Sequence, residues 1–160
     1  LMSEADLVAD CVKAMRDASS LPITVKHRIG VDKTQSYEFV RDFIGTVAGA
    51  GCEVFIVHAR SAWLEGLSPK ENREIPPLRY EIVHQLKREF PQLTIAINGG
   101  FTDCEQIAEQ LQLVDGVMIG RKAYHEPYFM HSFDQQFWPQ LANSPALTRE
   151  VVEEEMGITE

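Results

Sequence analysis

The most informative stretch of this sequence is Glu53-Val54-Phe55-Ile56-Val57-His58-Ala59-Arg60. An apolar, β-branched run of this length is typical of a buried strand, and polar side chains follow it directly. Three further apolar runs predict strands, at residues 23–26, 93–97 and 116–119. Predicted amphipathic helices separate the runs. Four apolar strands that alternate with helices indicate a parallel α/β sheet, covered by helices so that the strands are buried on both faces.

Polar residues with capping chemistry mark where these helices begin. We expect capping boxes formed by Ser3 with Asp6 and by Thr102 with Glu105, and a cap at Ser36. Apolar residues at helical spacing follow each of these positions and also follow residue 79. The order of elements is therefore a helix, three strand–helix pairs, and a fourth strand.

The alternation of strands and helices stops after Tyr128. Phenylalanines at positions 129, 133 and 137 predict a helix, residues 139–145 a linker, and residues 148–156 a further helix. We interpret residues 131–160 as the linker and the beginning of an all-α region.

Composition limits the classes of protein to which this chain can belong. Its 160 residues, 44% of them hydrophobic, are enough for one ordinary domain or two small ones. The net charge of −9 argues against a generally basic nucleic-acid-binding surface, although not against a local basic site. No apolar run has the length of a membrane span. Cys11, Cys52 and Cys104 lack the spacing of a metal site, which fits reduced thiols in the cytoplasm.

Every predicted strand is followed by polar residues or glycines. These are Lys26-His27-Arg28, His58-Ala59-Arg60, Asn98-Gly99-Gly100 and Gly120-Arg121. Parallel α/β proteins bind ligands at the carboxyl ends of their strands. Taken singly, each group has a simpler interpretation: a structural histidine, a tight Asn-Gly turn, or a surface arginine. Their occurrence at successive strand ends favours a binding site.

Glycines before helices on two successive strands predict a phosphate site. Gly99-Gly100 and Gly120 would let backbone N–H groups approach an anion closely, as at the last two strands of a (β/α)8 barrel. Arg121 would add a charged hydrogen bond. Lys26 and His58, on the neighbouring strands, would then face the rest of the ligand, so the pattern predicts a phosphate-bearing cofactor.

The long segment from residue 59 to residue 77 has two interpretations. Trp63 beside interspersed basic residues could stack on and bind single-stranded RNA. The simpler interpretation, which the residues alone favour, is a solvated lid with Trp63 packed into the core.

Five segments together identify a family resemblance. They are Pro22–Gly30, Phe55–Arg60, Gly66–Leu78, Ile97–Gly100 and Gly116–Arg121. They resemble the tRNA-dihydrouridine synthases, most closely the subgroup that acts on the D-loop, for which Gly66–Leu78 is specific. The resemblance runs from residue 1 to about residue 130.

The resemblance implies an oxidoreductase, a tRNA-processing flavoprotein with a TIM barrel. Residues 1–130 would be the carboxyl-terminal half of an FMN-binding barrel, and residues 131–160 the start of a truncated helical tRNA-binding domain. In this family, NADPH reduces FMN, the flavin delivers hydride to the uracil ring of tRNA, and a cysteine donates a proton.

Matching positions imply roles for individual residues. Flavin contacts are implied for Lys26, His58, Asn98, Gly99, Gly100, Gly120 and Arg121. Contacts with tRNA are implied for Lys70 and Arg73. Arg28 and Arg60, at the same rim, would contact flavin or RNA. No metal site is expected.

The chain departs from the family pattern in one respect. The family's proton-donating cysteine precedes a Leu-Met pair, and Leu1-Met2 begins this chain. None of the three cysteines fits that role. The strands present would be the last four of eight. We therefore expect the chain alone to be inactive, and its exposed sheet edges to favour self-association.

Two other interpretations of the residues remain open. One is another phosphate-binding TIM-barrel enzyme, either flavin-dependent or acting on sugar phosphates. The other is a non-catalytic fragment that serves as a folded or assembly module.

Overall fold

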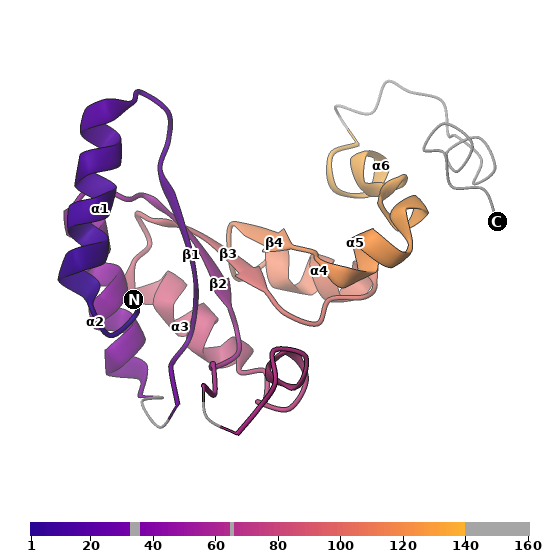
Figure 1. Ribbon diagram of the computed structural model, residues 1–160. Helices are drawn as coiled ribbons and strands as arrows, with labels where there is room; N and C mark the ends of the chain where they lie inside the picture. The colour runs from indigo at the N-terminus through magenta and orange to yellow at the C-terminus, as the bar shows by residue number, and fades with distance from the viewer. Residues whose placement is uncertain (33–35, 65, 140–160) are drawn as a thin grey trace. The chain divides into compact units, whose positions relative to one another are not determined.

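The computed structural model describes residues 1–32, 36–64 and 66–139 (Figure 1). By contacts the chain divides into two units, residues 1–118 and the residues from Ile119 onward. In the first unit the elements are α1 (Ala5–Ala18), β1 (Thr24–Arg28), α2 (Tyr37–Gly49), β2 (Val54–His58), η1 (Glu71–Arg73), α3 (Tyr80–Glu89), β3 (Thr94–Asn98), α4 (Cys104–Leu111) and β4 (Gly116–Met118).

The sheet is parallel throughout and follows the order β1-β2-β3-β4. Each connection contains a helix, as parallel strands require. This confirms the predicted fold class, an α/β sheet consistent with part of a (β/α)8 barrel and followed by helices. In the part of the chain that the structure describes, no helix is long and apolar enough to cross a membrane.

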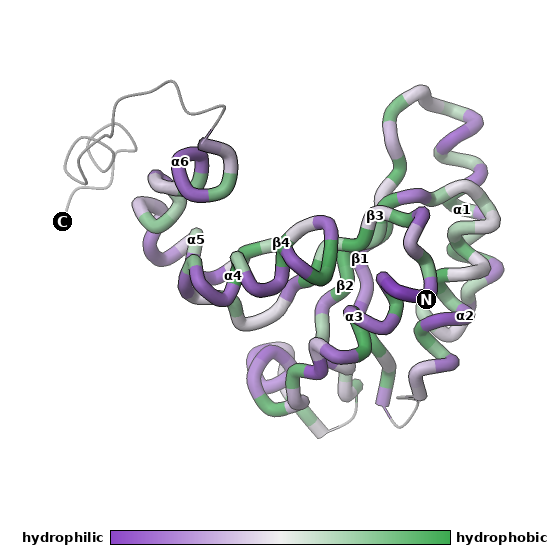
Figure 2. Tube along the Cα trace, turned by 180° about the vertical axis from the view of Figure 1, so that it is seen from behind, coloured by the Kyte–Doolittle hydropathy of each residue, from purple (hydrophilic) through white to green (hydrophobic). Residues whose placement is uncertain are grey.

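One face of the sheet forms the core. Phe55 and Val57 of β2 and Ile95 and Ile97 of β3 are fully buried. They belong to the same core as the buried residues of the covering helices, which are Val40, Phe43, Ile44 and Val47 of α2 and Ile82, Val83 and Leu86 of α3. Figure 2 shows that hydrophobic residues gather along β2 and β3 and alternate with hydrophilic residues along the helices.

The other face of the sheet is only partly covered. Along β2 and β3, buried residues alternate with half-buried ones such as Ile56 and Ala96. The expectation that the strands are buried on both faces is therefore wrong for this chain. The reason is that successive side chains of a strand point to opposite faces, and only one face is buried among the described residues.

The helix caps differ in part from the prediction. Ser36 caps α2 as expected, since its hydroxyl accepts a hydrogen bond from the Phe39 N–H at 3.2 Å. At α1, however, Glu4 is the N-cap without a side-chain bond, so the box of Ser3 and Asp6 is wrong. At α4 the cap is Asp103, one residue later than predicted, because its carboxylate accepts the Gln106 N–H at 2.9 Å.

The second unit contains three short helices, α5 (Arg121–His125), η2 (Pro127–Met130) and α6 (Phe133–Phe137), among its described residues. The single helix predicted through Phe129, Phe133 and Phe137 is thus divided between η2 and α6. The Phe129 and Phe133 rings still meet edge to face at 5.2 Å, and the Phe133 and Phe137 rings at 5.5 Å. Apart from Pro139, the predicted linker and the helix at 148–156 lie outside the described residues. The domain roles given to residues 1–130 and 131–160 stay predictions.

Candidate functional site

Strand register brings several predicted site residues onto one face of the sheet. Arg28, His58 and Asn98 are neighbours across β1, β2 and β3, each at the last position of its strand. Lys26 lies two residues earlier on β1 and therefore on the same face. This is the partly covered face, so the sheet presents a cation, an imidazole and an amide away from the core.

Lys26 and Asn98 contact each other directly. The Lys26 Nζ donates to the Asn98 Oδ1 at 3.4 Å, and the Asn98 Nδ2 donates to the Met118 carbonyl at 2.8 Å. These two bonds set the orientation of the amide. The pKa of Lys26 is lowered, first by partial loss of hydration and then by the charge of Arg28. The ammonium group is thus poorly compensated by the protein, which favours contact with an anionic or electron-rich ligand.

The turn after β3 requires both of its glycines. Gly99 and Gly100 have φ angles of 137° and 78°, which side chains of L-residues rarely adopt. A Cβ atom would also lie 2.6 Å from Leu78 Cδ2 at Gly99 and 2.8 Å from Leu78 Cδ1 at Gly100. The His58 ring lies close by, with its Cδ2 3.2 Å from the same position at Gly99. The turn leads into a capped helix and not into a hairpin, as the sequence predicted.

The segment from Arg60 to Leu78 is a closed loop. Its ends meet in an antiparallel bridge between Arg60 and Leu78. Inside the loop, the side-chain amide of Asn72 forms two hydrogen bonds with the backbone of Trp63. The Trp63 backbone N–H donates to the Asn72 Oδ1 at 2.7 Å, and the Asn72 Nδ2 donates to the Trp63 carbonyl at 2.5 Å. Trp63 is half-buried and is not one of the core residues, so its predicted packing into the core is only partly realised.

Arg28 and Arg60 reach the backbone of this loop. The Arg28 Nη1 donates to the carbonyls of Ser61, at 2.8 Å, and Asn72, at 2.9 Å. The Arg60 Nη1 donates to the Glu74 carbonyl at 2.6 Å and to the Pro76 carbonyl. The pKa of Arg28 is lowered by burial and by the charges of Arg60 and Arg73. The two rim arginines therefore stabilise the loop by hydrogen bonds to its backbone.

Lys70 and Arg73 lie at the two ends of η1 and are exposed. A reciprocal pair holds this turn: the Ser68 N–H donates to the Glu71 carboxylate at 2.8 Å, and the Glu71 N–H donates to the Ser68 hydroxyl at 3.3 Å. This is a capping box, which orders the turn without using either basic side chain. The loop thus offers two positive charges to solvent from a fixed backbone.

Gly120 and Arg121 belong to the second unit. Gly120 is the N-cap of α5 and Arg121 its first residue, and both are exposed. Their predicted participation in one phosphate site with Gly99 and Gly100 stays a prediction.

Sequence reasoning missed three residues that hold the site together: Asn72, Leu78 and Tyr80. Asn72 had a signal, since a capping box of Ser68 and Glu71 precedes it and predicts an ordered turn. Leu78 and Tyr80 act through contacts with residues about 20 positions away, for which no local pattern exists.

None of the three cysteines lies in a strand of the sheet. Cys11 is exposed in the middle of α1, and Cys104 begins α4. Cys52 is buried just before β2, with its Sγ 3.4 Å from the Val54 carbonyl oxygen, and burial raises its pKa. Burial also raises the pKa of Cys104.

Among the described residues, no group of three or more His, Cys, Asp or Glu side chains is arranged to hold a metal ion.

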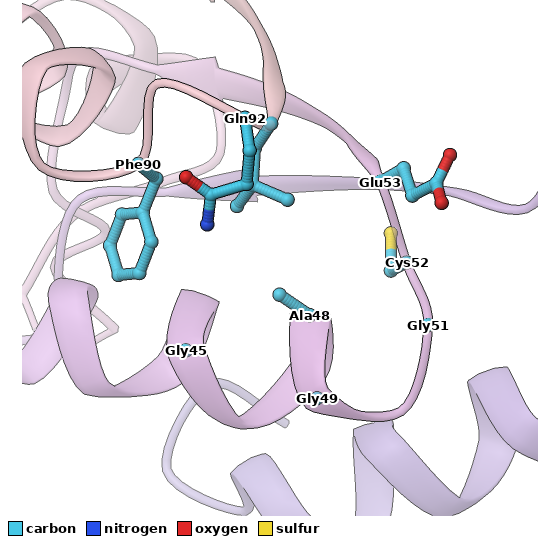
Figure 3. Close-up of a pocket in the computed structure, with 9 residues that line it drawn as sticks. Gly45, Ala48, Gly49, Gly51, Cys52, Glu53, Phe90 and Gln92 are labelled. Atoms are coloured by element: carbon cyan, nitrogen blue, oxygen red, sulfur yellow. The ribbon is translucent and has the colours of Figure 1, made fainter.

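A hollow of about 500 Å³ lies at the opposite end of the sheet, between the end of α2 and the segment that follows α3. Figure 3 shows Phe90 and Gln92 facing Gly45 and Ala48, with Cys52 at one side. Among the described residues that line it, Glu53 alone is charged, so the lining offers no basic group to hold a phosphate.

Comparisons with known proteins agree on one family. The family model described as dihydrouridine synthase matches residues 1–157. A tRNA-dihydrouridine(20/20a) synthase of Pseudomonas syringae pv. tomato is 57% identical over 98% of the chain and 46% of its own length. Proteins of the same name are 60% identical in Escherichia coli K12, over 86% and 40%, and 55% identical in Haemophilus ducreyi, over 98% and 47%. The chain therefore spans less than half the length of these curated relatives.

Proposed function

The chain belongs to the dihydrouridine synthase family, and we propose that it supplies the cofactor-binding side of an active site that reduces uridines in tRNA to dihydrouridine. The names of its relatives, tRNA-dihydrouridine(20/20a) synthases, support D-loop uridines of tRNA as the substrate. We further propose that the enzyme acts in the cytoplasm and that NADPH is the reductant.

One observation carries this proposal: Lys26, His58 and Asn98 share the partly covered face of the sheet, beside the Gly99–Gly100 turn. This donor set fits FMN. A cation and an amide suit the electron-rich flavin ring, and a turn of two left-handed glycines suits a phosphate. When bound, FMN would supply the hydride that reduces the uracil ring.

The residues of this chain would bind and orient the cofactor. The Lys26 ammonium, held by Asn98 at 3.4 Å, would stabilise negative charge on the ring system beside it. His58 lies close to Gly99 on the neighbouring strand, so it would contact the flavin ring or the ribityl chain attached to it. Backbone N–H groups of the Gly99–Gly100 turn would hold the phosphate.

The loop from Arg60 to Leu78 would contact the RNA. Lys70 and Arg73 point their charges to solvent from an ordered turn, as a contact with a phosphate backbone requires. Arg28 and Arg60 would act mainly by supporting that turn, since their guanidinium groups already bind loop carbonyls.

The test is an assay of the full-length protein with unmodified tRNA, FMN and NADPH, in which dihydrouridine formation is measured. Replacing both Lys70 and Arg73 by alanine is expected to weaken tRNA binding about tenfold or more at low salt. The slope of log K against log salt should flatten by about 2, one unit for each lost phosphate contact. FMN affinity should stay unchanged.

The matched control is the Lys13→Ala, Arg88→Ala double variant, which removes the same charge from exposed positions on α1 and α3. It should bind tRNA like the unaltered protein. An enzyme acting on small sugar phosphates would show no tRNA-dependent turnover, and neither double variant would change its activity. That result would reject the proposed function.

A further inference from the structure

Tyr80 contacts the glycine turn from two sides. It is the first residue of α3 and lies two residues after Leu78, where the Arg60–Leu78 loop ends. Its hydroxyl donates to the Gly99 carbonyl at 2.5 Å. Its ring stacks on the Phe101 ring, with centroids 5.2 Å apart and planes inclined by 18°. Tyr80 therefore holds the residues on both sides of Gly100.

The bond to the Gly99 carbonyl also sets the direction of an N–H group. The Gly99 C=O and the Gly100 N–H belong to one planar peptide unit, and the described residues contain no cis peptide bond. In a trans peptide these two groups point in opposite directions. The Gly100 N–H is therefore turned away from Tyr80, and it cannot rotate unless the Tyr80 hydrogen bond breaks.

The glycine turn is packed by an apolar side chain on one side and is hydrogen-bonded by the Tyr80 hydroxyl. Leu78 fills the space beside both glycines, within 2.6 and 2.8 Å of where a Cβ would lie. The Tyr80 hydroxyl would be 3.4 Å from a Cβ at Gly100. Burial raises the pKa of Tyr80, so the hydroxyl stays protonated at neutral pH and remains a donor. Two glycines are conformationally free, and without such contacts the turn would sample several orientations.

We propose that Tyr80 is a positioning residue for the phosphate of the flavin: its hydroxyl orients the Gly99–Gly100 peptide so that the Gly100 N–H faces the anion. The inference rests on the proposed FMN site. Tyr80 itself does not touch the reacting atoms. It acts through the peptide unit that it holds, and it does so from the base of the loop that carries Lys70 and Arg73.

The experiment compares Tyr80→Phe with the unaltered full-length protein by titration with FMN and with riboflavin, which lacks the phosphate. The ring and its stack on Phe101 remain, and only the hydroxyl is lost. The dissociation constant for FMN is expected to rise about fivefold, the equivalent of about 1 kcal/mol for one neutral hydrogen bond. The dissociation constant for riboflavin should not change. A general loosening of the structure would instead weaken the binding of both flavins.

Tyr37→Phe is the matched control. Tyr37 also donates a hydrogen bond of 2.5 Å, to the Glu89 carboxylate, but this bond joins α2 to α3 away from the turn. Loss of this bond should change neither the dissociation constant for FMN nor that for riboflavin.

A second variant, Phe101→Leu, keeps the Tyr80 hydroxyl and removes the stacked ring. It should also weaken FMN binding selectively, and it provides the test if Tyr80→Phe fails to fold.

Three outcomes would overturn the inference in distinguishable ways. Unchanged FMN affinity in Tyr80→Phe would reject the role of Tyr80 and leave the proposed function intact. Equal weakening of FMN and riboflavin would reject an effect on the phosphate turn. If the unaltered protein bound both flavins equally, the glycine turn would not be a phosphate site, and the proposed cofactor assignment would fail with it.

Discussion

His27 lies between two site residues in the chain and yet faces away from the site. Lys26 and Arg28 point to the partly covered face, whereas His27 is only 7% exposed and packs against the rings of Phe43 and Phe55. Its Nδ1 donates to the Arg28 carbonyl at 2.6 Å. Burial is the main reason that the pKa of His27 is lowered to about 4. At the residue scale, strand alternation alone separates this structural histidine from its functional neighbours.

The low pKa of His27 predicts a loss of stability in mild acid. The unfolded chain takes up the proton near pH 6.5, whereas the folded chain does so only near pH 4. The contribution of His27 to the free energy of unfolding is therefore complete above pH 6.5. It is lost as the pH falls to about 4, and the total loss is about 3 kcal/mol. Chemical unfolding at a series of pH values measures it.

The comparison for this prediction is His27→Leu, which replaces the titratable imidazole by an apolar side chain of similar size. Its free energy of unfolding should depend less on pH between 6.5 and 4 than that of the unaltered chain. Parallel curves for the two proteins would show that His27 does not carry the pH dependence.

At the scale of elements, the Arg60–Leu78 loop is ordered by its contacts with the sheet more than by its own secondary structure. Its only regular element within the described residues is the three-residue turn η1. Arg28, at the end of β1, binds two of its carbonyls, and Arg60, at the start of the loop two residues after β2, binds two more. A loop held in this way presents its basic residues in a fixed arrangement, although it is long and mostly exposed.

Removing one of these supports should loosen the loop. In Arg28→Met the bonds to the Ser61 and Asn72 carbonyls are lost, while most of the side-chain volume remains. We expect trypsin to cut after Lys70 and Arg73 about tenfold faster, because charged hydrogen bonds contribute about 1.5–3 kcal/mol each. Limited proteolysis followed by mass spectrometry measures the rates.

Arg41→Met provides the control for proteolysis. Arg41 pairs with Asp42 on the surface of α2, so its loss should leave cleavage in the loop unchanged. Equal cleavage rates in Arg28→Met and the unaltered protein would mean that Arg28 does not support the loop.

At the scale of the molecule, the described sheet has two edges. β1 and β4 are its outer strands, and each is hydrogen-bonded to one neighbour within the part of the chain described. The face that carries Lys26 and Asn98 is only partly covered. Unpaired strand edges and incompletely covered faces favour association with further polypeptide.

The isolated 160-residue chain is therefore expected to self-associate in a concentration-dependent way, through β1 or β4. Sedimentation velocity over a hundredfold range of concentration measures this. A single species of monomer mass at every concentration would contradict the expectation and indicate that both edges are protected.

Much of the architecture could be predicted from local patterns. Apolar runs such as Phe55–Val57 are strands, and the residues that follow them meet at one edge of the sheet because parallel strands end together. This is why the sequence alone was enough to group Lys26, His58 and Asn98. The cap of α4 was misplaced by one residue, since Thr102 and Asp103 both have capping side chains and only backbone geometry selects Asp103.

The family, the order of strands and helices, and the types of side chain at the strand ends could all be predicted from the amino-acid sequence, because they depend on local composition and period. Which face of β1 is buried, and that Arg28 and Arg60 bind loop carbonyls, became visible in the folded chain. So did the hydrogen bond from the Tyr80 hydroxyl to the Gly99 carbonyl. Such contacts join residues that are distant in the chain, and they form only when the packing of the sheet and its helices brings them within hydrogen-bond distance.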